Sequence, residues 1–567
     1  MFCLPRFSLL PVVTSLLALS LSACQRGQSQ STSLAPLPQD PLIQVYTNHN
    51  PASEYQEPYR QQIRPGDNLE QIIIDSISQA QTSIDLAVQE LRLPGVAAAL
   101  SQRQKAGVQV RVILENTYSR PFSSFTTAEI ARLPAREQSR YNEARRLIDL
   151  DQNGQLSQVE INQRDALIML DQARIPRIDD TADGSDGSNL MHHKFVVIDN
   201  QTVIVTSANF TTSDMHGDFS SPSSRGNANN LLKIESPELA AQFQREFDLM
   251  WGDGPGGKPD SLFGVKKPYR PAQTVQIGTT PVIVQFSPTS RRVPWSRSSN
   301  GTISKTLSTA SQSIDLALFV FSDQQLVNGL EDTHQRGVAI RALIDPGFAY
   351  RSYSEALDML GVALAGEDCQ LEPDNRLWQP PLTSVGVPRM PPGDLLHHKF
   401  GLIDGRTVIT GSHNWTDAAN TGNDETVLII SNPTVAAHYQ REFERLYANA
   451  ILGVPPAIRK KATPQPQCSS KRQSSQIRLS PKPSKSPSHR QSSPSAQRST
   501  QAVVQPPINV NTASQAELEA LPGVGPSLAK RIQIARQQRP LRSLADLDQI
   551  PGVGPKLLRQ LQSTVVF

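Results

Sequence analysis

The sequence predicts an α/β fold built from two similar halves. Short apolar runs alternate with helical patterns, as expected when helices cover the faces of a sheet. The segment AQTSIDLAVQ (80–89) returns as ASQSIDLALF (310–319), and AGVQVRVILE (106–115) returns as RGVAIRALID (336–345). Because both pairs are 230 residues apart, we interpret the main part of the chain as an internal repeat in which each half reads strand, helix, strand.

The chain has 567 residues, which is too long for a single core. Its net charge of +3 and 38% hydrophobic content are typical of a soluble protein. The predicted segments are a signal peptide at 1–23, a tether at 24–40, a first half at 41–260 with an insertion at about 126–175, a second half at 261–458, a linker at 459–505 and a C-terminal domain at 506–567. The linker is rich in Ser, Pro and Gln, and its residues 459–500 carry ten lysines and arginines and no acid. We expect it to be a disordered cationic segment.

The first residues, MFCLPRFSLLPVVTSLLALSLSAC, are typical of a secretory signal and too short for a good transmembrane helix. The end of this segment resembles the bacterial lipobox, which implies lipidation of Cys24 and a membrane-anchored protein outside the cytosol, in the periplasm or at the cell surface. A plain signal peptide is the alternative. Of the four cysteines, Cys369 and Cys468 would then remain, which is not a disulfide framework.

The tetrapeptide HHKF occurs once in each half, in LMHHKFVVIDN (190–200) and LLHHKFGLIDG (395–405). In a strand, alternate residues share a face, so the first His and the Lys of each copy project together, whereas His193 and His398 point away. A turn and a return strand follow each copy. Each half therefore presents one imidazole, one ammonium, one hydroxyl and one amide: His192, Lys194, Ser207 and Asn209 in the first, and His397, Lys399, Ser412 and Asn414 in the second.

This set of side chains indicates a phosphate site. Lysine, serine and asparagine donate hydrogen bonds and are poor metal ligands, so they suit the oxygens of a phosphate and leave the histidines for nucleophilic or acid–base work. Metal binding by the histidine pairs is a weaker interpretation, because the nearby lysine would repel a cation. Two solvated basic strands are the other alternative, but the spacing H-x-K-x4-D-x6-(T/G)-S-x-N recurs in both halves.

The segments HHKFVVIDNQTVIVTSAN and HHKFGLIDGRTVITGSHN resemble the two HKD motifs of the phospholipase D superfamily, over roughly residues 40 to 450. The resemblance implies a two-half α/β sandwich with both motifs at one site. It also implies that one histidine attacks phosphorus to form a phosphohistidine, and that the other protonates the leaving oxygen and later activates water. No metal or cofactor takes part in that chemistry, and Asp199 and Asp404 would be supports.

The two halves differ at one position that matters for this chemistry. Glu425 in GNDETVLII aligns with Asn229 in GNANNLLKI, and in the family an acidic residue there commonly hydrogen-bonds the motif histidine. A carboxylate raises the pKa of an imidazole, whereas a neutral amide only orients it. We therefore expect His192 to start neutral as the nucleophile, and His397, paired with Glu425, to start as the general acid.

The insertion contains the twelve residues DLDQNGQLSQVE (149–160), which match the calcium loop of an EF-hand. Gly154 stands at the sharp turn, and the segments on both sides have helical patterns. The expected ligands of a structural Ca²⁺ ion are Asp149, Asp151, Asn153, Gln155, Ser157 and Glu160. An acidic surface loop is the alternative.

The C-terminal segment contains LPGVGPSLAKRI and, in near copy, IPGVGPKLLRQL. The glycines permit tight turns whose backbone N–H groups precede a helix and can hold a phosphate. The segment resembles a tandem helix-hairpin-helix domain, particularly that of competence proteins of the ComEA type, which implies a small all-α fold and sequence-independent DNA binding. The implied DNA contacts are Gly523, Gly525, Lys530, Arg531, Gly552, Gly554, Lys556 and Arg559. A protein-interaction role for this fold is the alternative.

Three functions fit these motifs: a membrane-anchored DNA-binding nuclease, a phospholipase D or phosphatidyl transferase that acts on phospholipid headgroups, and a DNA-capturing surface receptor with weak catalysis. The helix-hairpin-helix resemblance favours DNA. The net acidic composition of the two halves and the membrane anchor favour lipid. Because both motifs lie in one chain, the site does not require an oligomer.

Overall fold

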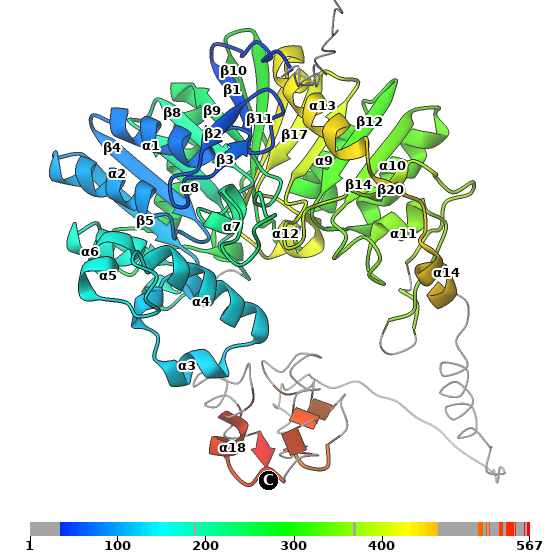
Figure 1. The fold of residues 1–567 in the computed structure, drawn as a ribbon. Coiled ribbons are helices and arrows are strands. Elements are labelled where there is room, and N and C mark those ends of the chain that lie inside the picture. Colours follow the sequence, from blue (N-terminus) through cyan, green and yellow to red (C-terminus); the bar gives the residue numbers. More distant parts are fainter. Residues whose placement is uncertain are drawn as a thin grey trace, which may run out of the picture. The chain divides into compact units, whose positions relative to one another are not determined.

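The computed structural model describes residues 34–185, 189–366, 370–372 and 374–462. Near the C-terminus it describes residues 508–513, 517–518, 521, 532–533, 535–536, 540–548, 550, 561 and 564–567. The chain divides into two compact units, Met1–Arg478 and Leu479–Phe567. The first unit holds both halves of the repeat, each built around one large sheet (Figure 1).

The first half contains a seven-stranded sheet in the order β1-β9-β8-β7-β4-β5-β6. Its central strands pair in parallel, β4 with β5, and antiparallel, β4 with β7. The strands are β1 (Ile43–Thr47), β4 (Ser83–Val88), β5 (Gln109–Leu114), β6 (Arg177–Asp179), β7 (Lys194–Ile198), β8 (Thr202–Thr206) and β9 (Asn230–Glu235). The helices are α1 (Leu69–Gln79), α2 (Pro94–Lys105), α7 (Thr212–Met215) and α8 (Pro237–Trp251), and a hairpin is formed by β2 (Glu54–Gln56) and β3 (Ile63–Pro65).

The second half repeats this arrangement in a nine-stranded sheet, β10-β11-β19-β17-β16-β12-β14-β15-β20. The succession β12, α10, β14, β16 matches β4, α2, β5, β7, which confirms the predicted α/β repeat. The strands are β10 (Gln273–Ile277), β11 (Thr280–Ser287), β12 (Ser313–Leu318), β14 (Ala339–Ile344), β15 (Val385–Val387), β16 (Lys399–Ile403), β17 (Thr407–Gly411), β19 (Glu425–Ser431) and β20 (Ile451–Leu452). The helices are α9 (Ser299–Leu307), α10 (Gln324–Gln335), α11 (Glu355–Met359), α12 (Asp417–Thr421), α13 (Pro433–Tyr447) and α14 (Pro456–Ala462), with a short pair β13 (Phe321–Ser322) and β18 (Trp415–Thr416).

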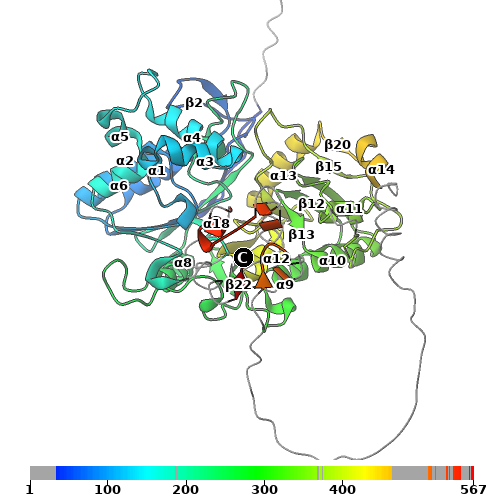
Figure 2. The same ribbon diagram turned by 90° about the horizontal axis from the view of Figure 1, so that it is seen from below.

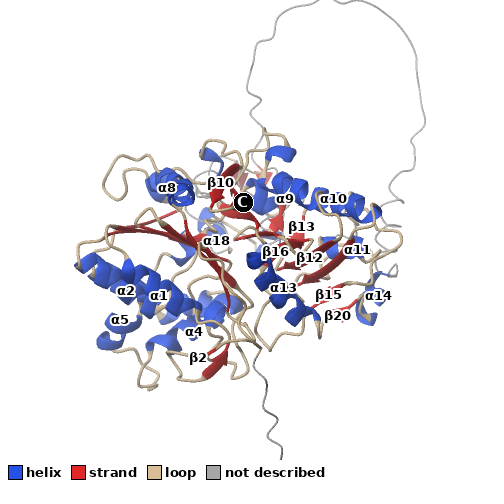
Figure 3. Ribbon diagram, turned by 90° about the horizontal axis from the view of Figure 1, so that it is seen from above, coloured by secondary structure: helices blue, strands red, loops and turns tan. Residues whose placement is uncertain are grey.

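The two halves share one hydrophobic core. Apolar side chains of α8 and α13, including Phe243 and Tyr439, pack there with residues from both sheets, such as Phe195 and Phe400. Each half also has an outer core, formed by α1 and α2 on the first sheet and by α9 and α10 on the second. Figure 3 shows α1 and α2 on one face of the first sheet and α8 on the other. Because strands such as β7 are buried on both faces, they are continuous apolar runs.

The predicted insertion forms four helices beside the first half: α3 (Thr127–Arg132), α4 (Ala135–Ile148), α5 (Gln158–Arg164) and α6 (Ala166–Gln172). Helix α6 packs against α2, and α5, α4 and α3 follow in succession, with α3 farthest from α1 and α2 (Figure 1). Figure 2 shows the same four helices from below. Helix α4 is fixed to the first half by an ion pair between Arg140 and the buried carboxylate of Glu90, 2.5 Å apart. The insertion is therefore docked on the first half rather than projecting from it.

In the second unit, the described residues include β21 (Ile508–Asn509), which pairs in parallel with β22 (Val565–Val566), and helix α18 (Leu544–Asp548). Val510, Leu518 and Ile532 belong to a small apolar core. The eight glycines, lysines and arginines predicted to contact DNA lie outside the described residues, as do Cys24, Cys369, Cys468 and nearly all of the predicted linker. Within the part of the chain that is described, no helix is long and apolar enough to span a membrane.

Candidate active site

The two HHKF motifs meet at a cavity of about 700 Å³ that both halves line. The main chain before each motif crosses to the other half. His192 N–H donates to the carbonyl of Asp424 at 3.0 Å, and His397 N–H donates to the carbonyl of Ala228 at 3.1 Å. Both imidazoles line the cavity and are 6% exposed. The structure therefore places the predicted histidine pair at one site.

The crossing of the main chain reverses the predicted pairing of the histidines. Glu425 accepts a hydrogen bond from Nδ1 of His192 at 2.7 Å, and Asn229 faces Nδ1 of His397 at 3.0 Å. The expectation that Glu425 pairs with His397 is wrong, because each acid or amide follows the segment that pairs with the other half's motif. The partners on Nδ1 leave Nε2 of each histidine for the substrate.

The two serines do not face the cavity, so the prediction that they donate hydrogen bonds to the phosphate is wrong. Ser207 Oγ donates to Asn229 at 2.7 Å, and Ser412 Oγ donates to Glu425 at 2.8 Å; both serines are fully buried. They fix the groups that orient the histidines. Strand β8 ends at Thr206, one residue before Ser207. The serine prediction assumed that strand alternation continues through Ser207, and it does not.

Asn209 and Asn414 do line the cavity. The amide oxygen of each is buried and has no hydrogen-bond partner among the described residues. Unsatisfied buried polar atoms are costly, so these oxygens indicate a ligand that includes a donor, such as the attacking water. The amide N–H groups remain the atoms that can donate to phosphate oxygens. Of the predicted neutral donors, these two amides are the ones that can reach a bound phosphodiester.

The second histidine of each motif points away from the cavity, as strand alternation predicts. His193 and His398 have no exposed surface and lie 3.5 and 2.9 Å from Glu246 and Glu442, which belong to α8 and α13. These contacts tie each motif to the central helices. They give His193 and His398 a role in the fold.

Asp199 and Asp404 stand at the far turns of the motifs. The Asp199 carboxylate accepts from the backbone N–H groups of residues 81, 82 and 83, and Asp404 accepts from those of residues 311, 312 and 313. Both have positive φ values, 52° and 51°. Each aspartate therefore fastens its hairpin to the start of a neighbouring strand, far from the cavity.

The motif lysines lie beneath the histidines. Lys194 Nζ donates to the carbonyl of His192 at 2.9 Å, and Lys399 Nζ donates to that of His397 at 2.7 Å. Burial lowers the pKa of Lys194 to about 8, and burial together with the charge of Lys194 lowers the pKa of Lys399 to about 7. Burial and these charges also lower the pKa of both cavity histidines well below the usual value. An anionic substrate would offset the two ammonium charges and so raise the pKa of His397, which lets this histidine carry a proton in the complex.

These pKa values predict how catalytic efficiency depends on pH. Below pH 7 both lysines are protonated and attract the phosphate, so kcat/KM is expected to fall as pH rises through about 7 to 8. In the Lys399→Arg variant the guanidinium stays charged throughout this range. The fall in kcat/KM should then move to higher pH, toward the pKa of Lys194. A kcat/KM that stays flat across this range in the wild type would contradict the prediction.

Comparisons with known proteins agree with this geometry. The family model described as cardiolipin synthase, PLD-like domain, matches residues 73–251 and 303–447, which is more than half of the chain. The chain belongs to this family. A model described as helix-hairpin-helix motif matches residues 503–566.

Among curated proteins, the mitochondrial cardiolipin hydrolase of Mus musculus is 32% identical over 157 residues, which is 27% of this chain and 61% of that protein. That of Xenopus laevis is 29% identical over 187 residues, 32% of this chain and 78% of that protein. Among solved structures, phosphatidylserine synthase of Haemophilus influenzae has 12% identity and a TM-score of 0.45 over 78% of this chain and 94% of that one. Nuc from Salmonella typhimurium has 20% identity and a TM-score of 0.24, covering 31% of this chain and 100% of that one.

Asp214 is a residue of this phospholipase D-like site that sequence reasoning missed. Its Oδ1 lies 3.6 Å from Nδ1 of His397, and the residue is 3% exposed. When Asn209 is aligned with Asn414, Asp214 aligns with Ala419. The first half thus has a carboxylate at 214 and an amide at 229, whereas the second half has its carboxylate at 425. Each half therefore has one carboxylate, at a different position of the repeat, and this difference between the aligned halves is the feature of the sequence that could have identified Asp214.

We expect Asp214→Asn to weaken the general acid rather than the fold. Removing the nearby negative charge lowers the pKa of His397, so the alkaline limb of the kcat profile should move to lower pH and kcat should fall by about tenfold. Asn229→Asp is the converse variant and should move the limb to higher pH. If kcat-against-pH profiles of the two variants coincide with the wild type, Asp214 does not act on His397.

The surroundings of the two cavity histidines also differ. Phe319 packs on the His397 ring with centroids 4.9 Å apart, whereas the corresponding position of the first half holds Gln89, which accepts from Lys194 at 3.3 Å. Helix α4 of the insertion adds a further wall, with Arg136 and Arg140 lining the cavity. The insertion is therefore part of the site and not a separate appendage.

The predicted calcium loop lies between α4 and α5. Carboxylate oxygens of Asp149, Asp151 and Glu160 come within 4.8 Å of one another. Gly154 has φ 79°, and its N–H donates to Asp149 at 2.9 Å. Oδ1 of Asp149 is buried and has no hydrogen-bond partner among the described residues. The residues present therefore suit a hard cation that prefers oxygen ligands.

Proposed function

We propose that this protein is a DNA-binding nuclease that breaks phosphodiesters through a phosphohistidine. One observation carries the choice of DNA: the helix-hairpin-helix match at residues 503–566 lies in the same chain as the phospholipase D-like catalytic halves. Such motifs bind the DNA backbone without reading its sequence. The signal segment ending at Cys24 supports a lipid-anchored, extracytoplasmic location as part of this proposal.

The geometry supports an ordered pair of steps. Nε2 of His192 attacks phosphorus, and the bond to the leaving oxygen breaks as His397 donates a proton to that oxygen. His397, now neutral, takes a proton from water, and the water oxygen displaces His192 from phosphorus. Glu425 stabilises the positive charge that develops on His192, and Asp214 does the same for His397. The pairing of Glu425 with His397, on which these roles first depended, does not occur. The proposal keeps the roles on a different ground: Glu425 hydrogen-bonds the attacking His192 directly at 2.7 Å, whereas the carboxylate of Asp214 lies 3.6 Å from His397.

Phospholipid cleavage or headgroup exchange is the second candidate. The family description and the relatives' names, mitochondrial cardiolipin hydrolases, favour it. The cavity also includes the apolar side chains of Phe122, Phe319 and Phe348, which could contact the glycerol end of a lipid.

A paired assay tests the two candidates. The full mature chain is given single-stranded and plasmid DNA, and separately vesicles containing cardiolipin or phosphatidylcholine, with His192→Ala as the control. We expect DNA fragments and no headgroup release. Headgroup release with intact DNA would overturn the nuclease proposal, as would DNA binding that His192→Ala shares and that leads to no cleavage in either protein.

We also propose that the loop at 149–160 binds Ca²⁺ as a structural ion, with Asp149, Asp151, Asn153, Gln155, Ser157 and Glu160 as its ligands. Ser157 and Glu160 already hold each other, because each side chain caps the backbone N–H of the other at the start of α5. The ion would fix the end of α4, which lines the catalytic cavity.

Chelation is therefore expected to lower stability. At a calcium concentration of about 100 times Kd, binding to the folded chain adds about 2.7 kcal/mol, which chelation removes. Thermal unfolding with and without calcium measures this change, with magnesium as the ionic control. Glu160→Gln should abolish the response to calcium. An unfolding temperature that is insensitive to both calcium and chelator in the wild type would contradict the site.

A further inference from the structure

A second large cavity, of about 660 Å³, lies on the other side of α4 from the catalytic histidines. We call it the arginine cavity; it is lined by Tyr59, Arg60, Arg145, Arg146, Arg164 and Phe219. Leu147 of α4 lines both this cavity and the catalytic one. A single helix therefore separates the two cavities.

The arginine cavity has an excess of positive charge. Asp149 is the one carboxylate among its described lining residues. Arg60 pairs with Glu57 at 3.2 Å and Arg146 with Glu143 at 3.5 Å. Within the described parts of the chain, Arg145 and Arg164 form no ion pair. Their guanidinium groups are suited to bidentate contacts with phosphate oxygens.

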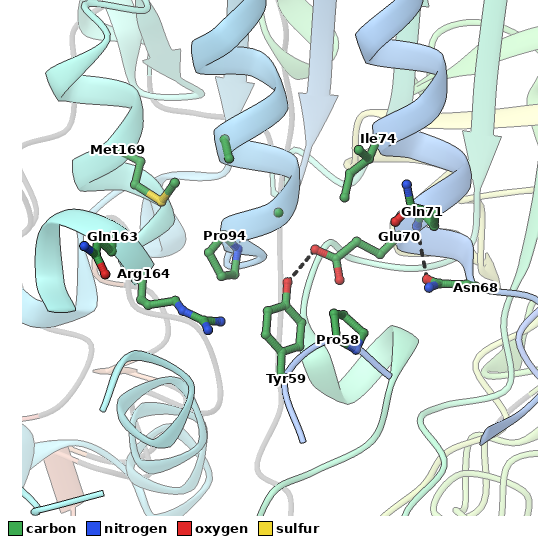
Figure 4. Close-up of a pocket in the computed structure, with 12 residues that line it drawn as sticks. Pro58, Tyr59, Asn68, Glu70, Gln71, Ile74, Pro94, Gln163, Arg164 and Met169 are labelled. Carbon is green, nitrogen blue, oxygen red and sulfur yellow. Dashed lines mark hydrogen bonds between the residues drawn. The ribbon is translucent and has the colours of Figure 1, made fainter. Parts of the chain in front are cut away.

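The protein holds three of these arginines in place, and of the three only Arg60 is paired with a carboxylate among the described residues. Arg60 donates to the carbonyls of residues 216, 217 and 218, and its guanidinium lies 4.4 Å from the centre of the Phe219 ring. Arg145 donates to the carbonyl of Gly154. Arg164 lies 5.5 Å from the Tyr59 ring, and Figure 4 shows it extending toward that ring beside a smaller cavity of about 270 Å³.

We propose that the arginine cavity binds backbone phosphates of a single-stranded nucleic acid whose scissile phosphate lies at His192 and His397. The inference rests on the proposed nuclease function and extends it to a second site. An α-helix with its side chains is about 10 to 12 Å across, so a single strand that passes around α4 spans the two cavities with a few nucleotides.

The aromatic rings support a nucleic acid over a lipid headgroup. Tyr59 and Phe219 are both part exposed and stand beside the arginines. Guanidinium groups that lie over flat rings suit a strand, because bases stack on rings and on guanidinium planes while phosphates contact the N–H groups at their edges. A lipid headgroup would use the charges but not the rings.

The kinetic test compares a dinucleotide, which reaches only the catalytic cavity, with an oligonucleotide of about 12 nucleotides. In the full chain, the double variant Arg146→Glu, Arg164→Glu should cut the dinucleotide within about twofold of the wild-type kcat/KM. On the oligonucleotide, kcat/KM should fall by about tenfold or more. The slope of the logarithm of the binding constant against the logarithm of the salt concentration should become shallower by about 1.4, because each of the two lost phosphate contacts accounts for about 0.7.

The matched control is the double variant Lys105→Glu, Arg406→Glu, which makes the same charge change at exposed positions that line neither cavity. It should cut both substrates like the wild type. Equal losses on both substrates in the arginine variant, or no loss on the oligonucleotide, would overturn the inference and leave the nuclease function intact. So would loss of binding to phosphatidylglycerol vesicles with oligonucleotide cleavage unchanged.

A crosslinking measurement does not depend on cleavage. An oligonucleotide carrying 5-bromouracil is irradiated with the full-length His192→Ala chain, and the crosslinked peptides are identified by mass spectrometry. Crosslinks at Tyr59 or Phe219 support the inference even if the wild type cuts no DNA. Crosslinks confined to residues 503–566 contradict it, whatever the wild type cuts.

Discussion

Replacing His192 with alanine is expected to abolish phosphodiester cleavage, with kcat falling by about 10⁴-fold or more, because the variant lacks the nucleophile that forms the covalent bond to phosphorus. The His397→Ala variant should lose the proton donor but keep the nucleophile. With a substrate that has a good leaving group, this variant should therefore accumulate phosphate on His192. Rapid quench followed by peptide mapping measures the position of the phosphate.

His193→Gln is the matched control, because His193 is the neighbouring imidazole and points into the core. This variant should unfold at a lower temperature and keep kcat in the folded fraction. Phosphate found on His397 of the wild type, or a His397→Ala protein that retains full turnover, would reverse the assignment of nucleophile and acid.

The Glu425→Gln substitution is expected to lower kcat by about 100-fold or more. Glu425 is fully buried, and its carboxylate is the hydrogen-bond partner of His192 Nδ1. A neutral amide cannot stabilise the positive charge that His192 gains as it attacks, and it can also select the wrong tautomer. Single-turnover kinetics with the wild type and the variant separate this loss from any change in substrate binding.

Glu442→Gln provides the control for burial. Glu442 is 1% exposed and holds His398 and Arg445 away from the cavity. We expect this variant to lose stability, because the part-buried cation of Arg445 is left without its partner, and to retain kcat. If Glu425→Gln behaves like Glu442→Gln, the role of Glu425 is structural.

The sequence predicted the fold because the repeat is dense in local signals. The matching segments near residues 80 and 310 fixed the central strands, and alternation within HHKF separated His192 from His193 before any contact was known. The match of 149–160 to a calcium loop placed a helix on each side of it, as observed. The second of these helices ends at Arg164, because Asp165 caps a new helix there.

The sequence alone identified most groups of the site, namely two histidines, two lysines, two asparagines and one glutamate, but it also counted two serines that do not face the cavity. The tertiary structure determined which carboxylate or amide contacts which histidine. Glu425 contacts His192, 233 residues away, because the segments before the two motifs hydrogen-bond across the halves. Alignment of the repeat suggests that Glu425 and Asn229 each contact the histidine of their own half. Because the two halves pack about a common core, each contacts the histidine of the other half. The same packing brought α4 to the cavity and revealed Asp214, since burial and distance depend on contacts between distant segments, which local patterns do not encode.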